Sequence, residues 1–180
     1  MAPTRPTNRQ LVECVAAHMD VDADAISLAP IPSGKFNDSY YVLAGGTEYV
    51  LRIAPSRNAV FCFYEREMMR QEPFIHQMLL DRTTVPVARI YVFDDSHRIM
   101  PRDFLIMERL PGIAMSELTH VDEAAVLRQV GQALAQTHAQ KGNRYGYVGA
   151  HHPMEPQNSW AEAFHIMWRK LVDDVVSVGY

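Results

Sequence analysis

The sequence predicts an α+β protein in which a small antiparallel sheet precedes a group of helices. Short β-prone runs separated by turn residues fill residues 25–110, and one helical segment interrupts them. From residue 122 onward, apolar residues recur at helical spacing. The 180 residues are 48% hydrophobic and 21% charged, which is ordinary for a protein with its own core. We expect a sheet portion over residues 1–109 and a helical portion over residues 110–180.

The sheet portion is predicted to hold two helices and five strands. Thr7 and Asn8 are suited to cap a first helix that ends near Met19. A second helix is expected over residues 59–72, where Pro73 either ends it or starts another piece. Gly45 and Gly46 suit a tight hairpin because both can adopt positive φ. The expected strands cover residues 26–29, 39–43, 48–53, 89–93 and 103–107.

The helical portion follows the stop signal Leu110-Pro-Gly112. One amphipathic helix is predicted over residues 122–139, and Ser159 with Glu162 forms a capping box for a last helix that ends at Gly179. This last helix has a broad apolar side, which predicts self-association. The residues on that side include Trp160, Phe164, Met167, Trp168 and Leu171.

Charge and composition argue against several kinds of partner. The formal net charge of −4 offers no basic face for nucleic acid, and the apolar run of residues 59–64 is far too short to span a membrane. Cys14 and Cys62 are isolated thiols, which favours a reducing, cytoplasmic setting. The eight histidines are scattered, so no metal site is expected.

The loop between the first two strands is a candidate for phosphate binding. Small residues allow backbone amides to approach phosphate oxygens, and Lys35 adds a positive charge. The alternative is a plain surface hairpin, which the loop taken alone favours. The candidate contacts are Ser33, Gly34, Lys35, Asn37 and Ser39.

Arg52 and Glu67 form a second candidate element. Arg52 ends an apolar strand, and Glu67 lies on the apolar stripe of the predicted helix over residues 59–72. A strand cation paired with a helix glutamate positions the phosphates of ATP in protein kinases. The alternative is an edge arginine and a solvated glutamate, and Glu65 competes with Glu67 for the role.

A third candidate element is the segment that leaves the last strand, where unpaired backbone groups can meet an adenine edge. A simple linker between two lobes is the alternative. The candidate residues are Met107, Glu108, Arg109 and Leu110.

Together these segments resemble the aminoglycoside phosphotransferase and choline kinase-like family. The resemblance implies a protein-kinase-like N-lobe followed by the first helices of a helical C-lobe. It also implies ATP binding and transfer of a phosphoryl group to a hydroxyl of a small molecule, such as an aminoglycoside, amino alcohol or sugar. The matching segments are residues 33–42, 49–52, 66–67, 85–87, 104–112 and 133–138.

The sequence departs from this family at the catalytic loop. The family's H-x-D-x-x-x-x-N motif is absent, because His120-Val-Asp122 is followed by Leu127 where the asparagine should stand. We therefore assign no catalytic residue and no metal ligand, and expect Mg²⁺ only with a missing C-terminal part. The main hypothesis is the N-terminal, nucleotide-binding portion of a small-molecule kinase, inactive alone. The alternative is a non-catalytic adaptor or pseudokinase-like binding protein.

Overall fold

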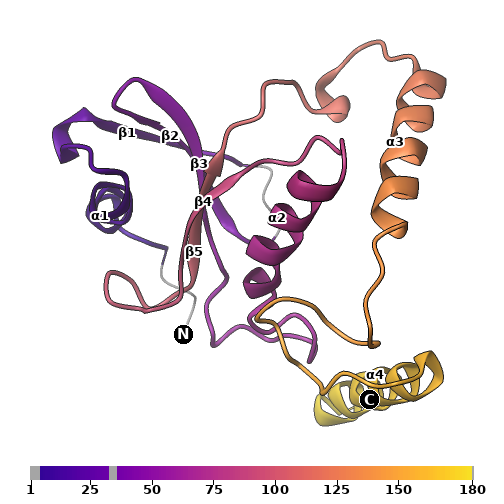
Figure 1. Ribbon diagram of the computed structural model, residues 1–180. Helices are drawn as coiled ribbons and strands as arrows, with labels where there is room; N and C mark the ends of the chain where they lie inside the picture. Colours follow the sequence, from indigo (N-terminus) through magenta and orange to yellow (C-terminus); the bar gives the residue numbers. More distant parts are fainter. Residues whose placement is uncertain (1–4, 33–35, 180) are drawn as a thin grey trace.

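A five-stranded antiparallel sheet forms the centre of the protein, seen in a computed structural model that describes residues 5–32 and 36–179 (Figure 1). The strands lie in the order β1-β2-β3-β5-β4. Each expected strand is confirmed to within two residues at either end, and so is the expected α+β arrangement of a five-stranded antiparallel sheet that precedes a group of helices. The strands are β1 (Ile26–Pro30), β2 (Asp38–Ala44), β3 (Thr47–Ile53), β4 (Ile90–Asp94) and β5 (Phe104–Glu108).

Helices cover both faces of this sheet. Alternation along β5 sends Phe104 and Ile106 to one face and Leu105 to the other, as the two-residue period of a strand requires. Helix α1 (Asn8–Met19) packs on the first face, and α2 (Glu72–Arg82) lies on the second. Each face of the sheet is therefore covered by a helix that is close in sequence to the strands.

The predicted cap of the first helix and the predicted hairpin turn are both confirmed. The Thr7 hydroxyl accepts a hydrogen bond from the Gln10 backbone amide, and the Gln10 side-chain oxygen accepts one from the Thr7 backbone amide. The start of α1 is therefore a complete capping box. Gly45 and Gly46 have φ values of 57° and 83° and join β2 to β3. These φ values match the tight hairpin that the glycine pair predicts.

The helix expected over residues 59–72 is wrong. That segment consists of turns and the short 3₁₀ helix η2 (Met68–Gln71), and α2 begins only at Glu72. Its amides do not form an i−4 ladder. The Cys62 amide donates to the Glu65 side chain and the Phe63 amide to the Asp174 side chain, and several others donate to carbonyls three residues earlier. Pro73 sits in the first turn of α2, where its missing N–H costs nothing.

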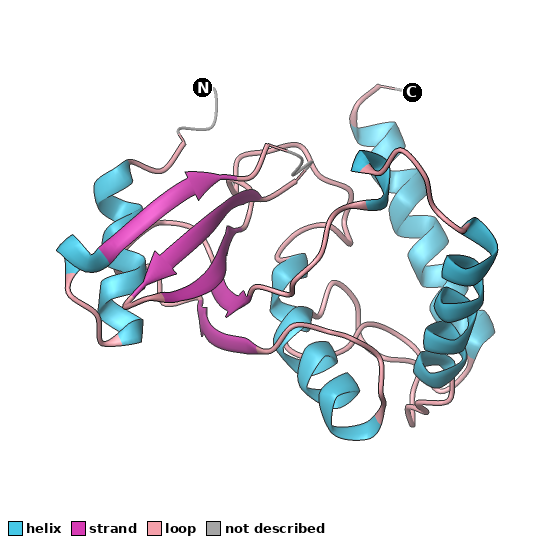
Figure 2. Ribbon diagram, turned by 90° about the horizontal axis from the view of Figure 1, so that it is seen from above, coloured by secondary structure: helices cyan, strands magenta, loops and turns pink. Residues whose placement is uncertain are grey.

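The helical portion stands to one side of the sheet (Figure 2). It contains η3 (Met115–Glu117), α3 (Glu123–His138, capped by Asp122) and α4 (Trp160–Ser177, capped by Ser159). Every residue of α3 and α4 is described, and only Ala163 among them is buried. In the described part of the chain, no helix combines the length and apolarity needed to cross a bilayer.

Candidate functional site

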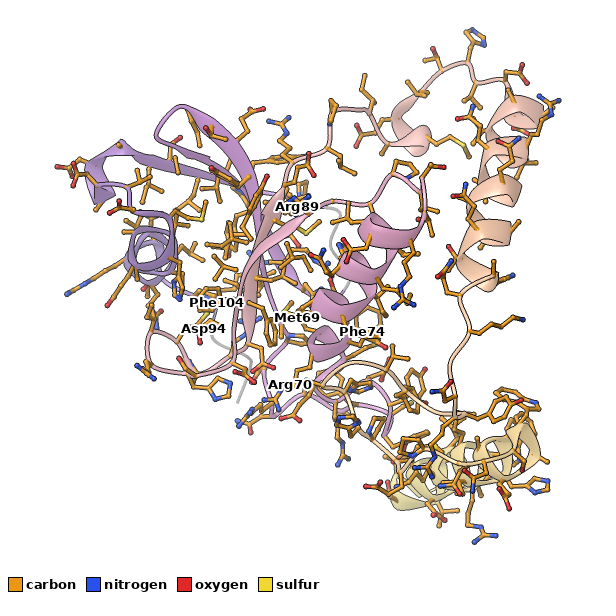
Figure 3. The ribbon with its side chains drawn as sticks, in the orientation of Figure 1. Met69, Arg70, Phe74, Arg89, Asp94 and Phe104 are labelled. Atoms are coloured by element: carbon orange, nitrogen blue, oxygen red, sulfur yellow. The ribbon has the colours of Figure 1, made fainter. Side chains whose placement is uncertain are left out.

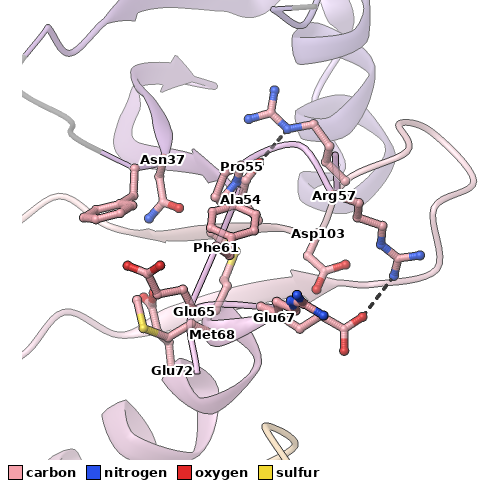
Figure 4. Close-up of a pocket in the computed structure, with 14 residues that line it drawn as sticks. Asn37, Ala54, Pro55, Arg57, Phe61, Glu65, Glu67, Met68, Glu72 and Asp103 are labelled. Carbon is pink, nitrogen blue, oxygen red and sulfur yellow. Dashed lines mark hydrogen bonds and ion pairs between the residues drawn. The ribbon is translucent and has the colours of Figure 1, made fainter. Parts of the chain in front are cut away.

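A cavity lies at the α2-facing edge of the sheet, where β3 ends and η2 begins (Figure 4). It measures about 270 Å³, and Phe36 and Asn37, which precede β2, are among the residues that line it. Charged side chains of both signs line it, so it suits a polar, charged ligand. These side chains are Arg57, Arg66, Arg102, Glu65, Glu67, Glu72 and Asp103.

Arg52 reaches from β3 to the first residue of α2. Its Nη1 donates to Glu72 Oε2 at 2.5 Å and its Nη2 to Glu72 Oε1 at 3.1 Å, a two-point contact between guanidinium and carboxylate. The two side chains are 26% and 18% exposed, so the pair is partly shielded from water. Ser39 lies directly opposite Arg52 in the β2–β3 register and therefore shares its face.

The partner of Arg52 is therefore Glu72, and the predicted pairing with Glu67 is wrong. Glu67 bonds to Arg57 at 3.2 Å and to Arg70 at 3.3 Å, and its side chain is 46% exposed. The error follows from the misplaced helix, because Glu67 precedes the helical turn that carries the carboxylate. Pro73 is the sequence feature that could have identified Glu72 as the partner. Proline is favoured in the first turn of a helix, so the residue next to it, Glu72, is a carboxylate in the first turn of α2.

A buried carboxylate anchors η2 from below. Asp103 is 4% exposed and accepts hydrogen bonds from Arg70 Nε at 3.0 Å and His97 Nε2 at 2.6 Å. Burial alone would raise the pKa of Asp103, but the bonds from Arg70 and His97 outweigh it, and the pKa lies below its ordinary value. Asp103 is therefore a carboxylate at neutral pH, and it ties Arg70 of η2, which Figure 3 labels, to the β4–β5 loop. No sequence pattern pointed to this cluster.

Arg102 fixes three strand ends at the cavity wall. It is 9% exposed, and it donates from Nε to the Ala54 carbonyl at 2.5 Å and from Nη2 to Asp38 Oδ2 at 2.7 Å. Asp38 begins β2, Ala54 follows β3, and Arg102 precedes β5. Two nitrogens of this guanidinium make structural contacts, so Arg102 holds the wall of the cavity in shape.

Part of the predicted phosphate loop is not described. Ser33, Gly34 and Lys35 lie outside the described residues. Asn37 lines the cavity, and Ser39 lies in β2 beside Arg52. The described end of the loop and the Arg52–Glu72 pair thus lie at the same end of the sheet.

The predicted adenine-binding segment is partly occupied by contacts of its own. The Glu108 amide donates to the Arg89 carbonyl at 2.8 Å, so this N–H already has an acceptor. The Arg109 side chain bonds to Glu48 and lies 4.5 Å from the centre of the Tyr41 ring. Met107 packs in the smaller core cluster on the α2 face, and Leu110 is 43% exposed.

Sequence comparison decides the family. The profile of the phosphotransferase enzyme family matches residues 27–175, which is most of the chain. The chain belongs to this phosphotransferase family. A search of curated protein sequences finds no match.

Solved phosphotransferases share the fold at low sequence identity. Aminoglycoside phosphotransferase APH(4)-Ia is 17% identical with a TM-score of 0.60, and the alignment covers 96% of this chain and 56% of that one. A provisionally assigned fructosamine-3-kinase from Haemophilus somnus 129PT is 18% identical, with a TM-score of 0.56 and coverage of 87% and 50%. A microcompartment-associated aminopropanol kinase is 16% identical, with a TM-score of 0.53 and coverage of 90% and 48%. The chain spans about half the length of these structures.

The described residues do not fit a magnesium ion. They bring no three His, Cys, Asp or Glu side chains together in a group that could hold a metal. Three of the four acidic side chains that line the cavity are instead paired with cations: Glu72 with Arg52, Glu67 with Arg57 and Asp103 with Arg70.

Proposed function

We propose that this chain is the nucleotide-binding portion of an ATP-dependent phosphotransferase that acts on a hydroxyl group of a small molecule. The observation that carries the proposal is the two-point contact of Arg52 with Glu72 beside a cavity that charged and apolar side chains line. A guanidinium has five N–H donors, and Glu72 engages two of its nitrogens, so further donors remain for phosphate oxygens. Solved APH(4)-Ia variants in complex with AMP-PNP and hygromycin B support nucleotide binding in this fold.

In this proposal the triphosphate of ATP lies along the face shared by Ser39 and Arg52. Asn37 and the loop from Ser33 to Lys35 cover the phosphates, and the backbone of residues 107–110 meets the adenine. Because the Glu108 N–H is taken by Arg89, the adenine contact uses other backbone atoms of this segment. The cavity of about 270 Å³ suits the phosphate end of the nucleotide, since whole ligand pockets are commonly about 300–1,000 Å³.

We propose that the 180-residue chain does not transfer phosphate by itself. Phosphoryl transfer depends on positioning and on charge neutralisation by Mg²⁺, and neither an H-x-D-x-x-x-x-N motif nor a fitting metal cluster accompanies the described residues. The division into a nucleotide-binding lobe over residues 1–109 and the start of a helical lobe over residues 110–180 belongs to the same proposal. We place the protein in the cytoplasm, since Cys14 and Cys62 are both free thiols.

The names of two solved relatives support a class of molecule that accepts the phosphoryl group. APH(4)-Ia and the aminopropanol kinase are named for hydroxyl-bearing, amine-containing substrates, which supports a small aminoglycoside, amino alcohol or sugar-like acceptor. The alternative function is a non-catalytic adaptor that keeps the same lobe. The exposed apolar sides of α3 and α4 favour the kinase portion, because a self-sufficient adaptor would be expected to cover them.

Calorimetric titration with AMP-PNP tests nucleotide binding. Arg52→Gln should weaken binding at least about tenfold, because a hydrogen bond to a charged group contributes about 1.5–3 kcal/mol. Arg57→Gln is the matched control: Arg57 lines the same cavity but is 56% exposed, and its substitution should change affinity less than about twofold. Absence of binding by the unchanged chain, or equal losses in the two variants, would contradict the proposal.

A further inference from the structure

The loop between α3 and α4 reaches back to the corner that carries Glu72. His151, at its tip, is 2% exposed, and its Nε2 donates to the Tyr64 carbonyl at 2.9 Å. Burial lowers the pKa of His151, so the ring is neutral near pH 7 and the proton on Nε2 serves this bond. His152, the next residue, is exposed. One of two adjacent histidines therefore has a defined internal partner 87 positions earlier in the chain.

The same loop touches the start of α2. Gly149 has a φ of +65°, and a methyl group on its Cα would lie 3.0 Å from Phe74 Cβ and 3.1 Å from Gln71 Cα. Gln71 and Phe74 flank Glu72 in the sequence. A residue larger than glycine at position 149 would thus press on the backbone that presents the Glu72 carboxylate to Arg52.

Aromatic rings set the orientation of His151. Its ring packs edge-on against Tyr147 with 5.2 Å between centroids, and Tyr147 packs in the same way against Phe63 at 6.3 Å. Tyr147 and His151 belong to the helical portion, whereas Phe63 and Tyr64 belong to the sheet portion. The contact is therefore a packed junction between the two portions.

The segment that follows Tyr64 contains a strained backbone conformation that contacts with other segments must stabilise. Between Tyr64 and Glu72, Glu67 adopts a φ of +58°, in the left-handed region that residues other than glycine rarely occupy. Such a conformation persists when surrounding contacts fix it. The Tyr64 carbonyl is fixed by His151 on one side of Glu67, and Arg70 is fixed by Asp103 on the other.

We propose that His151 is a positioning residue for the Arg52–Glu72 ion pair: its bond to the Tyr64 carbonyl holds the turn that ends at Glu72. His151 thus acts from the helical portion on a site formed by the sheet portion, without lining the cavity itself. The consequence for nucleotide affinity rests on the proposed function, whereas the effect on the ion pair does not.

Nuclear magnetic resonance of the Arg52 side chain tests the positioning directly. The Nε–H cross-peak of Arg52, assigned through its loss in Arg52→Lys, reports the environment of the guanidinium. His151→Leu should shift and broaden this cross-peak, and His151→Gln, whose amide can donate to the Tyr64 carbonyl, should restore it. His152→Leu is the matched control and should leave it unchanged. An unchanged cross-peak in folded His151→Leu overturns the proposal.

A second variant covers the case in which His151→Leu does not fold. Asparagine is shorter than histidine and does not extend to the Tyr64 carbonyl, so His151→Asn should move the Arg52 cross-peak as His151→Leu is expected to do. An unchanged cross-peak in folded His151→Asn overturns the proposal equally.

A titration with AMP-PNP separates the two proposals. His151→Leu should weaken AMP-PNP binding roughly threefold to tenfold, as expected for a residue coupled to a site that it does not touch. In a Glu72→Gln background the same substitution should have no further effect, since the ion pair through which it acts is already lost. Full additivity of the two substitutions contradicts action through Glu72. If the unchanged chain does not bind AMP-PNP, the proposed function fails, and the Arg52 cross-peak still decides the role of His151.

Discussion

The sheet portion and the helical portion differ in how completely they bury their apolar residues. In the sheet, Leu51, Ile53, Leu105 and Ile106 are all 0% exposed. In α3 and α4, large apolar residues stay open to solvent: Leu127 is 67% exposed and Trp168 is 59% exposed. Both portions have the apolar periodicity of their secondary structure, so periodicity alone does not decide burial.

The difference shows that an apolar face needs a partner within reach. The sheet faces are covered by α1 and α2, which are encoded next to the strands. Helix α3 is joined to residue Thr84 through Gln136, and α4 is joined to Phe63 through Asp174, but these contacts bury little of either helix. The candidate site accordingly lies in the portion that closes its own core, and the helical portion contributes to it through the loop at His151.

Two leucines give the largest test of this difference. Leu51→Ala in β3 should lower the free energy of unfolding by about 2–5 kcal/mol, because it removes a fully buried side chain and leaves a cavity. Leu127→Ala on α3 should change it by less than about 0.5 kcal/mol, since that side chain is mostly in water. Urea unfolding followed by circular dichroism measures both. Similar losses would show that α3 packs as tightly as the sheet.

The next test concerns the buried charge that ties η2 to the sheet. Asp103→Asn should lower the free energy of unfolding by about 3 kcal/mol, because it removes the buried carboxylate that pairs with Arg70 and leaves only the half-exposed Glu67 and Asp95. Asp95→Asn is the control, because Asp95 is 52% exposed and lies 4.0 Å from Arg70. Urea unfolding of both variants should show a clear loss only for Asp103→Asn.

The same carboxylate predicts a dependence of stability on pH. The pKa of Asp103 in the folded chain lies below its ordinary value of 3.8, so its ionised form stabilises the fold. This contribution is fully present above the unfolded pKa and is lost as the pH falls through the lower, folded pKa. Unfolding measured between neutral pH and pH 2 should therefore show a shallower acid loss in Asp103→Asn. A curve parallel to that of the unchanged chain would contradict the contribution of Asp103.

Self-association tests the open side of α4. Trp160, Phe164 and Trp168 form a row of rings with centroid separations of 5.9 and 6.1 Å, exposed by 58%, 44% and 59%. Burying an aromatic side chain contributes about 1.5–3 kcal/mol, so Trp168→Glu should weaken self-association by roughly 10-fold to 100-fold. Val60→Glu, at a site that is 90% exposed outside the helix, is the control. A monomer at tens of micromolar in light scattering, silent to a hydrophobic dye, would favour the adaptor function.

The smallest expected changes in stability come from two glycine substitutions, one in each portion, and they have opposite signs. Gly46→Ala should destabilise by about 1 kcal/mol, because the hairpin holds this residue at a φ of +83°. Gly131→Ala lies within α3 with open space around its Cα and should stabilise by about 0.8–1 kcal/mol through helix propensity. Thermal unfolding of both variants gives the signs. A lower thermal stability of Gly131→Ala would indicate that another segment packs closely against α3 at this position.

Much of the fold was predictable because its signals are local. The caps at Thr7 and Ser159 and the Gly45-Gly46 turn depend on neighbouring residues, and they set the correct boundaries. The helix expected over residues 59–72 failed because its amides form turns or bond to side chains, and one of these side chains, that of Asp174, is far away in the sequence. A periodic pattern does not reveal a partner more than one hundred positions away.

The candidate site was predictable in part for the same reason. Arg52 is where the sequence placed it, at the end of an apolar strand and with a glutamate partner. The identity of that partner depended on where α2 begins, and the misplaced helix made Glu67 the choice in place of Glu72. Asp103 and His151 carried no sequence signal, because their roles arise only from contacts between distant segments.

The most direct test compares the two glutamates in a titration with AMP-PNP. Glu72→Gln and Glu67→Gln make the same chemical change, five positions apart, at two residues that both line the cavity. We predict that Glu72→Gln weakens binding by about tenfold or more, because Arg52 loses the charged partner that orients it. Glu67→Gln should change the dissociation constant by less than about twofold, since its partners are Arg57 and Arg70 and it is largely solvated. Equal effects, or a larger effect at Glu67, would contradict the assignment of Arg52 and Glu72 as the pair that positions the nucleotide.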